Sequence, residues 1–404
     1  MAEPTRIDPF SPLTLGPRTL RNRFVKAATF EGMAHRGLVT DALVDFHRTV
    51  AAGGVAMTTV AYLAVSPEGQ GAPAEIVVRP EALAGLRDLA DAVHAEGALV
   101  SAQLGHAGPV ATATGRRGIA PSRVFSPMAM RFTRAATDDD LERATRDFVS
   151  GARTLADAGF DAVELHFGHG YLPSSFFSPK TNRRQDRWGG SVENRARFAR
   201  GIAEAVRSAV GGAMIVLAKL NMDDGVPGGL WLDDSLEIAR LLEGDGTLDA
   251  LELTAGSSFQ NPMYLFRGDA PVREMAAAFP PPVNLGMRLF GRFFLKEYPF
   301  EEAYLLPSAR QFRAALDMPL VLLGGVNRLD TVKRALDEGF PLVAMGRALL
   351  REPDLVNRMQ KGAAQESLCV HCNKCMPTIY RGTHCVLVPP DERPGHTVPG
   401  PERV

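Results

Sequence analysis

The segment AVELHFGHGY, residues 162–171, combines an apolar run with a group of polar side chains. Ala162–His166 is a short apolar run typical of a strand that is buried on both faces. His169 and Tyr171 follow just beyond its end, and Val192–Val210 then has the pattern of an amphipathic helix with Gly downstream. A buried strand that leads into a helix predicts one unit of an α/β fold.

Working outward, we find similar apolar runs along most of the chain, with amphipathic stretches between them. The other predicted strands are Phe24–Ala28, Ala56–Ala61, Leu99–Leu104, Ile215–Leu220, Ala250–Thr254, Leu320–Gly324 and Leu342–Met345, and further predicted helices are Glu81–Glu96, Thr137–Ala158 and Asp330–Glu338. Eight units favour a TIM (β/α)8 barrel. A doubly wound open sheet is the alternative, but no GxGxxG follows an early strand.

The length of 404 residues suits one large barrel domain with a tail. We expect the barrel to occupy residues 1–360, with an insertion after the sixth strand at about 255–310 that is rich in Phe and Pro. This insertion either lines the substrate pocket or packs as a small subdomain. Residues 361–404 form a cysteine-containing extension whose end, from Pro389, has the composition of a flexible tail.

The overall charge and the cysteine pattern limit the partners and the compartment. The formal charge of −1 provides no net field for nucleic acid or an anionic membrane. The N-terminus lacks a leader pattern, no stretch is apolar enough to span a membrane, and the four cysteines cluster between Cys369 and Cys385. We expect a cytoplasmic protein that acts on a small molecule, with homo-oligomerisation more probable than a monomeric state.

His166, His169 and Tyr171 lie where barrel enzymes keep their catalytic groups. Two neutral imidazoles can donate hydrogen bonds to a carbonyl or nitro oxygen, and a tyrosine can protonate carbon. The same histidines could instead be structural or bind zinc. Glu164 is the one carboxylate close in sequence, and we expect it to point elsewhere along the strand.

Residues 169–198, HGYLPSSFFSPKTNRRQDRWGGSVENRARF, provide a much longer motif. This stretch resembles the HGYL…FLSP…TNxRxDxYGGSxENRxRF signature of the Old Yellow Enzyme family of NADH:flavin oxidoreductases. The resemblance runs from Phe10 to about Leu350. It implies a TIM barrel that holds flavin mononucleotide (FMN) at the carboxyl ends of its strands and takes electrons from NADH or NADPH.

The same resemblance implies roles for individual residues. His166 and His169 match the pair that anchors the substrate, and Tyr171 matches the proton donor. The residues that match FMN contacts are Ala27, Ala28, Thr29 and Phe30 in the first strand, Gln103 at the flavin pyrimidine edge, Lys219 near flavin N1 and O2, and Gly324, Gly325, Gly346 and Arg347 at the phosphate.

Two of these positions depart from the family pattern. Phe30 stands where relatives often carry Thr or Cys, and Lys219 stands where many carry Arg. An aromatic ring at position 30 can supply neither a hydroxyl contact nor a thiol link, so we expect non-covalent FMN with an altered potential. Lysine keeps the positive charge without the planar fork of arginine.

Cys369, Cys372, Cys375 and Cys385 form a compact C-x2-C-x2-C-x9-C pattern. Four close thiolates can hold an iron-sulfur cluster or zinc, and unliganded cysteines can also pack as small apolar groups. The pattern resembles the 4Fe-4S segment of the dienoyl-CoA reductase and trimethylamine dehydrogenase branch. The spacing to Cys385 is shorter here, and those relatives continue into further domains.

Four functions are compatible with these features. The first is an ene-reductase that reduces the C=C bond of an enone or enal, with Tyr171 as the proton donor. The second is an iron-sulfur flavoprotein dehydrogenase that passes electrons to an external acceptor. A flavin-holding redox sensor and a barrel that binds another phosphorylated metabolite without flavin complete the set. The intact His/His/Tyr motif argues against the sensor, and the long signature argues against the flavin-free barrel.

Overall fold

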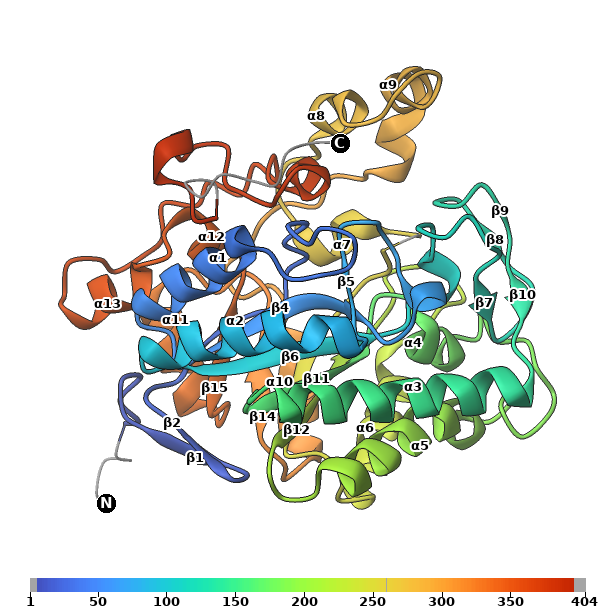
Figure 1. Ribbon diagram of the computed structural model, residues 1–404, viewed down its shortest axis with the longest axis horizontal. Coiled ribbons are helices and arrows are strands. Elements are labelled where there is room, and N and C mark those ends of the chain that lie inside the picture. The colour runs from blue at the N-terminus through green and yellow to red at the C-terminus, as the bar shows by residue number, and fades with distance from the viewer. Residues whose placement is uncertain (1–5, 259, 396–404) are drawn as a thin grey trace.

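The computed structural model describes residues 6–258 and 260–395, and eight parallel strands form a closed barrel at its centre (Figure 1). The barrel closes because β3 pairs with β15 on one side and with β4 on the other. In barrel order the strands are β3 (Phe24–Lys26), β4 (Met57–Ala64), β6 (Leu99–Gly105), β11 (Ala162–Phe167), β12 (Ile215–Asn221), β13 (Ala250–Thr254), β14 (Leu320–Leu322) and β15 (Leu342–Met345). The predicted TIM barrel is confirmed, and each predicted strand overlaps one of these eight.

Amphipathic helices surround the barrel and follow its strands. They are α1 (Asp41–Ala52), α2 (Leu83–Ala95), α3 (Asp138–Asp157), α5 (Val192–Val210), α6 (Leu232–Gly244), α10 (Leu306–Ala315), α11 (Leu329–Asp337), α12 (Arg347–Arg351) and α13 (Leu355–Gln360). In α3, Thr137 accepts from the amide of Asp140, and the Asp140 carboxylate accepts in return from the amide of Thr137. This capping box explains why the acidic stretch at the predicted helix start begins a helix.

The amino ends of the barrel strands are covered by a short hairpin of β1 (Leu13–Leu15) and β2 (Arg18–Leu20). Leu15 and Leu20 pack there against Val25, Ala162 and Ile215 in one apolar cluster. A larger apolar core lies between the strands and the surrounding helices. This arrangement leaves the carboxyl ends of the strands for polar and functional groups.

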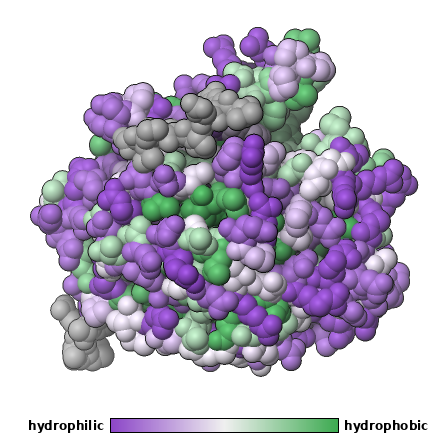
Figure 2. Space-filling model, viewed as in Figure 1, coloured by the Kyte–Doolittle hydropathy of each residue, from purple (hydrophilic) through white to green (hydrophobic). Residues whose placement is uncertain are grey.

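The long insertion after β13 contains α7 (Pro262–Phe266), which lies close to the barrel, and α8 (Val272–Ala277) and α9 (Val283–Phe294), which form a projection. Several of its aromatic side chains pack with Met263, Met275 and Met376 in a small core of their own, as the packing alternative predicted. The outer side of α9 is exposed, and Figure 2 shows apolar side chains on this projection: Val283, Leu285, Leu289, Phe290 and Phe293.

The C-terminal segment returns to the first barrel strand. It contains two short 3-10 helices, η4 (Met376–Tyr380) and η5 (Pro390–Glu392). The hydroxyl of Thr383 donates to the carbonyl of Phe30 at 2.5 Å, and its amide donates to the carbonyl of Glu31 at 2.7 Å. Residues 396–404 of the predicted tail lie outside the described residues. Among the helices of the described part, none is long and apolar enough to cross a membrane.

Candidate active site

The strand register places four polar side chains side by side inside the barrel. Glu164 of β11 lies opposite Gln103 of β6, and Lys219 of β12 lies opposite Glu252 of β13. Gln103 Nε2 donates to Glu164 Oε1 at 2.6 Å, Lys219 Nζ is 3.2 Å from the same oxygen, and Lys219 also contacts the Glu252 carboxylate. Glu164 therefore links two predicted FMN-binding residues, and its partners are these two and not the histidines.

In this buried row the Lys219 ammonium contacts two carboxylates, those of Glu164 and Glu252. Burial acts to lower the pKa of Lys219, but the charges of Glu164 and Glu252 outweigh it, so the pKa is raised and the side chain keeps its proton. Burial raises the pKa of Glu252 to about 7, and the neighbouring Glu164 acts in the same direction while Lys219 opposes both. A single positive charge cannot fully compensate two buried negative charges. Burial and the charge of Glu164 therefore favour the protonated form of Glu252.

The two predicted histidines and Tyr171 converge just beyond the end of β11. The ring of His166 lies 4.5 Å from that of Tyr171 and 5.0 Å from that of His169, measured between centroids. His169 adopts a left-handed φ of 60°, its amide donates to Asn221 Oδ1 at 3.0 Å, and its Nε2 shares a 2.9 Å hydrogen bond with Thr254 Oγ1. A sparsely populated backbone conformation fixed by two side chains is typical of a functional site.

Burial sets the protonation state of this group. It lowers the pKa of His169 to about 3 and that of His166 well below its usual range, and the positive charge of Lys219 adds to both shifts. It raises the pKa of the Tyr171 hydroxyl. At neutral pH the site therefore presents two uncharged imidazoles and a protonated phenol, as the motif predicted. His166 Nδ1 is buried and has no hydrogen-bond partner among the described residues.

Tyr62, at the carboxyl end of β4, joins this group although sequence reasoning missed it. Its ring lies 5.2 Å from that of Tyr171 and 6.1 Å from that of His166. Its hydroxyl oxygen is buried without a partner in the described part of the chain. Gly105 makes room for the ring, because a Cβ at that position would lie 2.5 Å from Tyr62 Cε2. Tyr62 immediately follows the predicted strand Ala56–Ala61, and its place at a strand end was the available signal.

The first strand approaches the eighth at the positions expected to line the flavin. The amide of Ala27 donates to the carbonyl of Met345 at 3.0 Å. A Cβ on Gly346 would lie 3.4 Å from Thr29 Cγ2, so this residue is close to the predicted phosphate-binding Gly346. Ala28 and Phe30 are partly buried in the same stretch.

The other predicted phosphate-binding residues also lie at the carboxyl ends of strands. Gly324 and Gly325 have left-handed φ values of 103° and 75°, which favour glycine. Arg347 begins α12, and its guanidinium donates to the carbonyl of Arg267 at 2.8 Å and to Oδ1 of Asn373. The structure therefore brings Arg347 together with the insertion and the C-terminal segment.

The four cysteines are all partly exposed in the C-terminal segment. Burial raises the pKa of the Cys375 thiol to about 12, and it also raises that of Cys369. Over residues 6–258 and 260–395, no three His, Cys, Asp or Glu side chains are grouped so that they could hold a metal ion. The iron-sulfur or zinc site stays a prediction.

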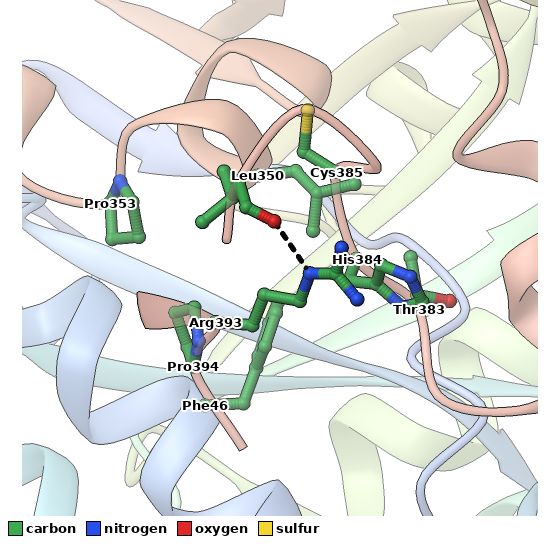
Figure 3. Close-up of a pocket in the computed structure, with 9 residues that line it drawn as sticks. Phe46, Leu350, Pro353, Thr383, His384, Cys385, Arg393 and Pro394 are labelled. Atoms are coloured by element: carbon green, nitrogen blue, oxygen red, sulfur yellow. Dashed lines mark hydrogen bonds between the residues drawn. The ribbon is translucent and has the colours of Figure 1, made fainter. Parts of the chain in front are cut away.

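Cys385 lines a small pocket on the outside of the barrel, shown in Figure 3. Phe46 of α1 and Leu350 of α12 form one side, and Arg393 closes the other, with its Nε donating to the carbonyl of Val388 at 2.8 Å. None of the predicted catalytic residues lines this pocket. It is therefore separate from the His/His/Tyr group.

The residues at the barrel mouth fit FMN. Lys219 and Gln103 offer a cation and an amide at strand ends, which suits the polar edge of a flavin ring. Gly324 and Gly325 leave the backbone after β14 without side chains, which suits a phosphate. The unpartnered atoms of His166 and Tyr62 provide buried polar groups beside these residues.

A closed parallel barrel with these groups at its carboxyl ends has the architecture of a barrel enzyme. The chain matches the model of the NADH:flavin oxidoreductase / NADH oxidase family over residues 8–244, more than half its length. The chain belongs to this family and is an FMN-dependent NAD(P)H oxidoreductase.

Individual relatives extend this result. The chain is 57% identical over 380 residues to a 4,4'-dithiodibutanoate disulfide reductase of Rhodococcus erythropolis, covering 94% of each sequence. It is 29% identical to an NADH oxidase of Thermoanaerobacter brockii over 90% of this chain and 52% of that protein, so it spans about half of this longer relative. The solved structure of an Old Yellow Enzyme homologue from Zymomonas mobilis matches with a TM-score of 0.71 at 23% identity, covering 91% of this chain and 96% of that one, and so supports the fold.

Proposed function

We propose that this protein uses NADH or NADPH to reduce a small organic disulfide, with an activated alkene as the second acceptor class. The observation that carries the proposal is the convergence of two uncharged imidazoles and two protonated phenols at the barrel mouth. Such a group can donate hydrogen bonds to an acceptor that gains negative charge and then return a proton to it.

FMN would be held by Lys219 and Gln103 at its ring and by the glycines after β14 and β15 at its phosphate. Bound FMN supplies the hydride chemistry that links nicotinamide oxidation to reduction of the acceptor. Glu164 positions both ring contacts, because it accepts from Gln103 and pairs with Lys219. Arg347 provides a positive charge at the phosphate end of the site.

The chain's own residues would handle the acceptor and its protons. His166 and His169 orient the acceptor as hydrogen-bond donors, and their low pKa values keep them from adding charge to the site. Tyr171 holds a proton that it can give to the reduced acceptor, because burial prevents its ionisation. His166 and Tyr62 are almost fully buried, which limits access of water to this part of the site.

The disulfide class is favoured by the 57% identity to a disulfide reductase across nearly the whole chain. Reduction of R–S–S–R breaks the S–S bond and consumes one hydride equivalent and one proton to give two thiols. A sulfur that leaves as thiolate needs hydrogen bonds before it is protonated. The rings of Tyr62 and Tyr171 lie 5.2 Å apart, so two phenols are available as donors at one end of the site.

The alkene class is favoured by the His166, His169 and Tyr171 arrangement itself. An enone or enal would accept hydrogen bonds from the imidazoles at its oxygen, a hydride at its β-carbon and the Tyr171 proton at its α-carbon. This reaction consumes one hydride and one proton, as disulfide reduction does, and it assigns no role to Tyr62.

Tyr171→Phe tests the proposed proton donor. We expect reduction of 4,4'-dithiodibutanoate and of 2-cyclohexenone to slow by roughly 10²–10⁴-fold where Tyr171 is the acid, because the proton is lost while the ring remains. Bleaching of the flavin by NADH should continue at nearly the wild-type rate. Stopped-flow absorbance would measure the two half-reactions separately, with Tyr380→Phe in the C-terminal segment as the matched control. Equal loss in both half-reactions would refute the assignment.

The cysteine cluster requires a separate measurement. Protein purified anaerobically without chelator would be analysed for iron, sulfide and zinc, and its spectrum recorded before and after NADH or NADPH. A yellow protein with flavin bands that bleach and with little iron supports the reductase proposed here. Iron and sulfide near four per chain would instead favour a dehydrogenase that passes electrons through the cluster to an external acceptor.

A further inference from the structure

A second small cavity lies at the rim of the barrel mouth, in the loop that follows β6. This loop carries η3 (Gly108–Val110) and four short strands, β7 (Ile119–Ala120), β8 (Phe125–Ser126), β9 (Arg131–Phe132) and β10 (Arg134–Ala135). The side chains and backbone that line the cavity come mainly from one stretch of the loop: Glu68, His106, Ala111, Thr114, Arg116, Arg117, Gly118 and Ile119.

His106 supplies this cavity with a buried hydrogen-bond donor. The amide of Gly108 donates to His106 Nδ1 at 3.1 Å, so Nδ1 is the unprotonated nitrogen and Nε2 carries the hydrogen. Nε2 is buried and has no partner among the described residues, although the side chain is only 1% exposed. A buried N–H without an acceptor is costly, so this position calls for an acceptor atom, either an ordered water or a ligand.

The charges at the cavity favour an anion. Arg116 and Arg117 are exposed, and within residues 6–258 and 260–395 neither forms an ion pair. The one acidic residue of the lining, Glu68, is already neutralised, because its carboxylate accepts from Arg143 Nη2 at 3.1 Å and from Nε at 3.3 Å. The cavity thus combines one buried donor with two unpaired guanidinium groups and a compensated carboxylate.

The cavity is separated from the catalytic tyrosine by one stretch of backbone. Tyr171 packs against the apolar cluster of Ala107, Val110 and Ala111, and Ala111 also lines the cavity. The amide of Leu172 donates to the carbonyl of His106 at 2.8 Å, which fixes the two segments together. The cavity therefore adjoins the same segment that packs against Tyr171.

We propose that Arg116, Arg117 and His106 bind a carboxylate of the electron acceptor, so that the enzyme selects acceptors with an acidic arm. The inference rests on the proposed reduction of a small acceptor and names its substrate class. Guanidinium groups match carboxylates in charge and geometry, and the His106 N–H donates to one of the carboxylate oxygens. In a disulfide with butanoate arms, the acid group is three methylenes from sulfur, a reach of roughly 5–6 Å in an extended chain.

A binding measurement separates this site from catalysis. Decanedioate has the chain length of 4,4'-dithiodibutanoate but carries no reducible bond, so its affinity for the FMN-loaded enzyme can be measured by calorimetry. We expect Arg116→Ala/Arg117→Ala to weaken its binding by roughly tenfold or more, because charge-assisted hydrogen bonds are lost. Arg116→Lys/Arg117→Lys keeps both positive charges and should retain part of the affinity. Arg153→Ala, on the exposed face of α3, is the control and should bind decanedioate as the wild type does.

Steady-state kinetics provide the second readout. The KM for 4,4'-dithiodibutanoate should rise by a similar factor in the Ala/Ala variant, while the KM for its neutral diamide and the KM values for NADH and NADPH stay unchanged. A rise in the nicotinamide KM instead would assign the cavity to a cofactor phosphate and overturn the proposal. An equal rise in KM for the diacid and the diamide would overturn it as well. So would an affinity for decanedioate that is unchanged when both arginines are replaced.

The two proposals fail differently. A wild-type enzyme that binds decanedioate through Arg116 and Arg117 but does not turn over the disulfide retains the carboxylate site and loses the disulfide-reductase function. An enzyme that turns over the disulfide with a KM independent of both arginines retains the function and loses the carboxylate site.

Discussion

Glu252→Gln tests whether Glu252 ionises at the expense of stability in the barrel interior, where it shares the Lys219 ammonium with Glu164. The Glu252 pKa rises from 4.5 to about 7 in the folded protein, chiefly because the side chain is buried. A folded-state pKa above the unfolded value means that the native state binds the extra proton, so stability falls as pH rises from about 4.5 to about 7. The shift corresponds to about 3 kcal/mol of lost stability once the group is ionised in both states.

Glutamine is a neutral mimic of the protonated acid and can still accept from Lys219. The wild type loses stability as Glu252 ionises, and the glutamine variant does not. We therefore expect the difference in unfolding free energy, Glu252→Gln minus wild type, to grow by about 2–3 kcal/mol from pH 5 to pH 8. For a chain of 404 residues the unfolding entropy is about 0.85 kcal/mol/K, so the Tm difference should grow by about 3 °C.

Thermal denaturation of the FMN-loaded enzyme at several pH values would measure this difference. Glu204→Gln, on the exposed face of α5, is the matched control and should give a curve parallel to that of the wild type. Parallel curves for Glu252→Gln, or a gap that widens towards acid pH, would refute the assignment of the titrating proton to Glu252.

Three further substitutions test other parts of the structure. Lys26→Met removes the ammonium that pairs with the buried carboxylate of Glu31 and should cost roughly 3–5 kcal/mol in urea denaturation, with partial recovery when Glu31→Gln is added. If Glu31→Gln restores no stability, the loss in Lys26→Met does not come from the Lys26–Glu31 ion pair. Thr137→Ala removes the capping box of α3 and should cost about 1 kcal/mol, so an unchanged urea midpoint would contradict the cap. Gly325→Ala requires a Cβ 2.7 Å from Tyr304 Cδ1 at a left-handed φ, and should weaken FMN retention measured by flavin fluorescence; wild-type retention would remove Gly325 from the phosphate site.

Much of the fold follows from local sequence pattern. A parallel strand made of a short apolar run is buried on both faces only when helices cover the sheet. Eight such runs with helices between them suit a closed barrel. The capping residues around Thr137 mark the start of α3 for the same local reason. Barrel closure itself came from the pairing of β3 with β15, which joins strands at opposite ends of the barrel domain.

Some residues of the candidate site were likewise predictable from local sequence, whereas others come together only through strand register. His166, His169 and Tyr171 were predictable because one strand and its following turn carry all three, so their proximity needs no tertiary contact. The row formed by Gln103, Glu164, Lys219 and Glu252 depends on strand register, and a one-residue slip would turn alternate side chains away from the barrel interior. Period-2 alternation places Glu164 on the His166 face, which local reasoning had not used.

The sequence by itself determined the barrel units, the long HGYL-to-RARF motif and the family that this motif indicates. Only the tertiary structure placed Tyr62 beside Tyr171, brought Arg116 and Arg117 to the cavity that His106 lines, and folded Thr383 back onto Phe30. The physical reason is that hydrophobic periodicity and capping act over a few residues, whereas these contacts join segments that meet only after the sheet closes and its register is fixed.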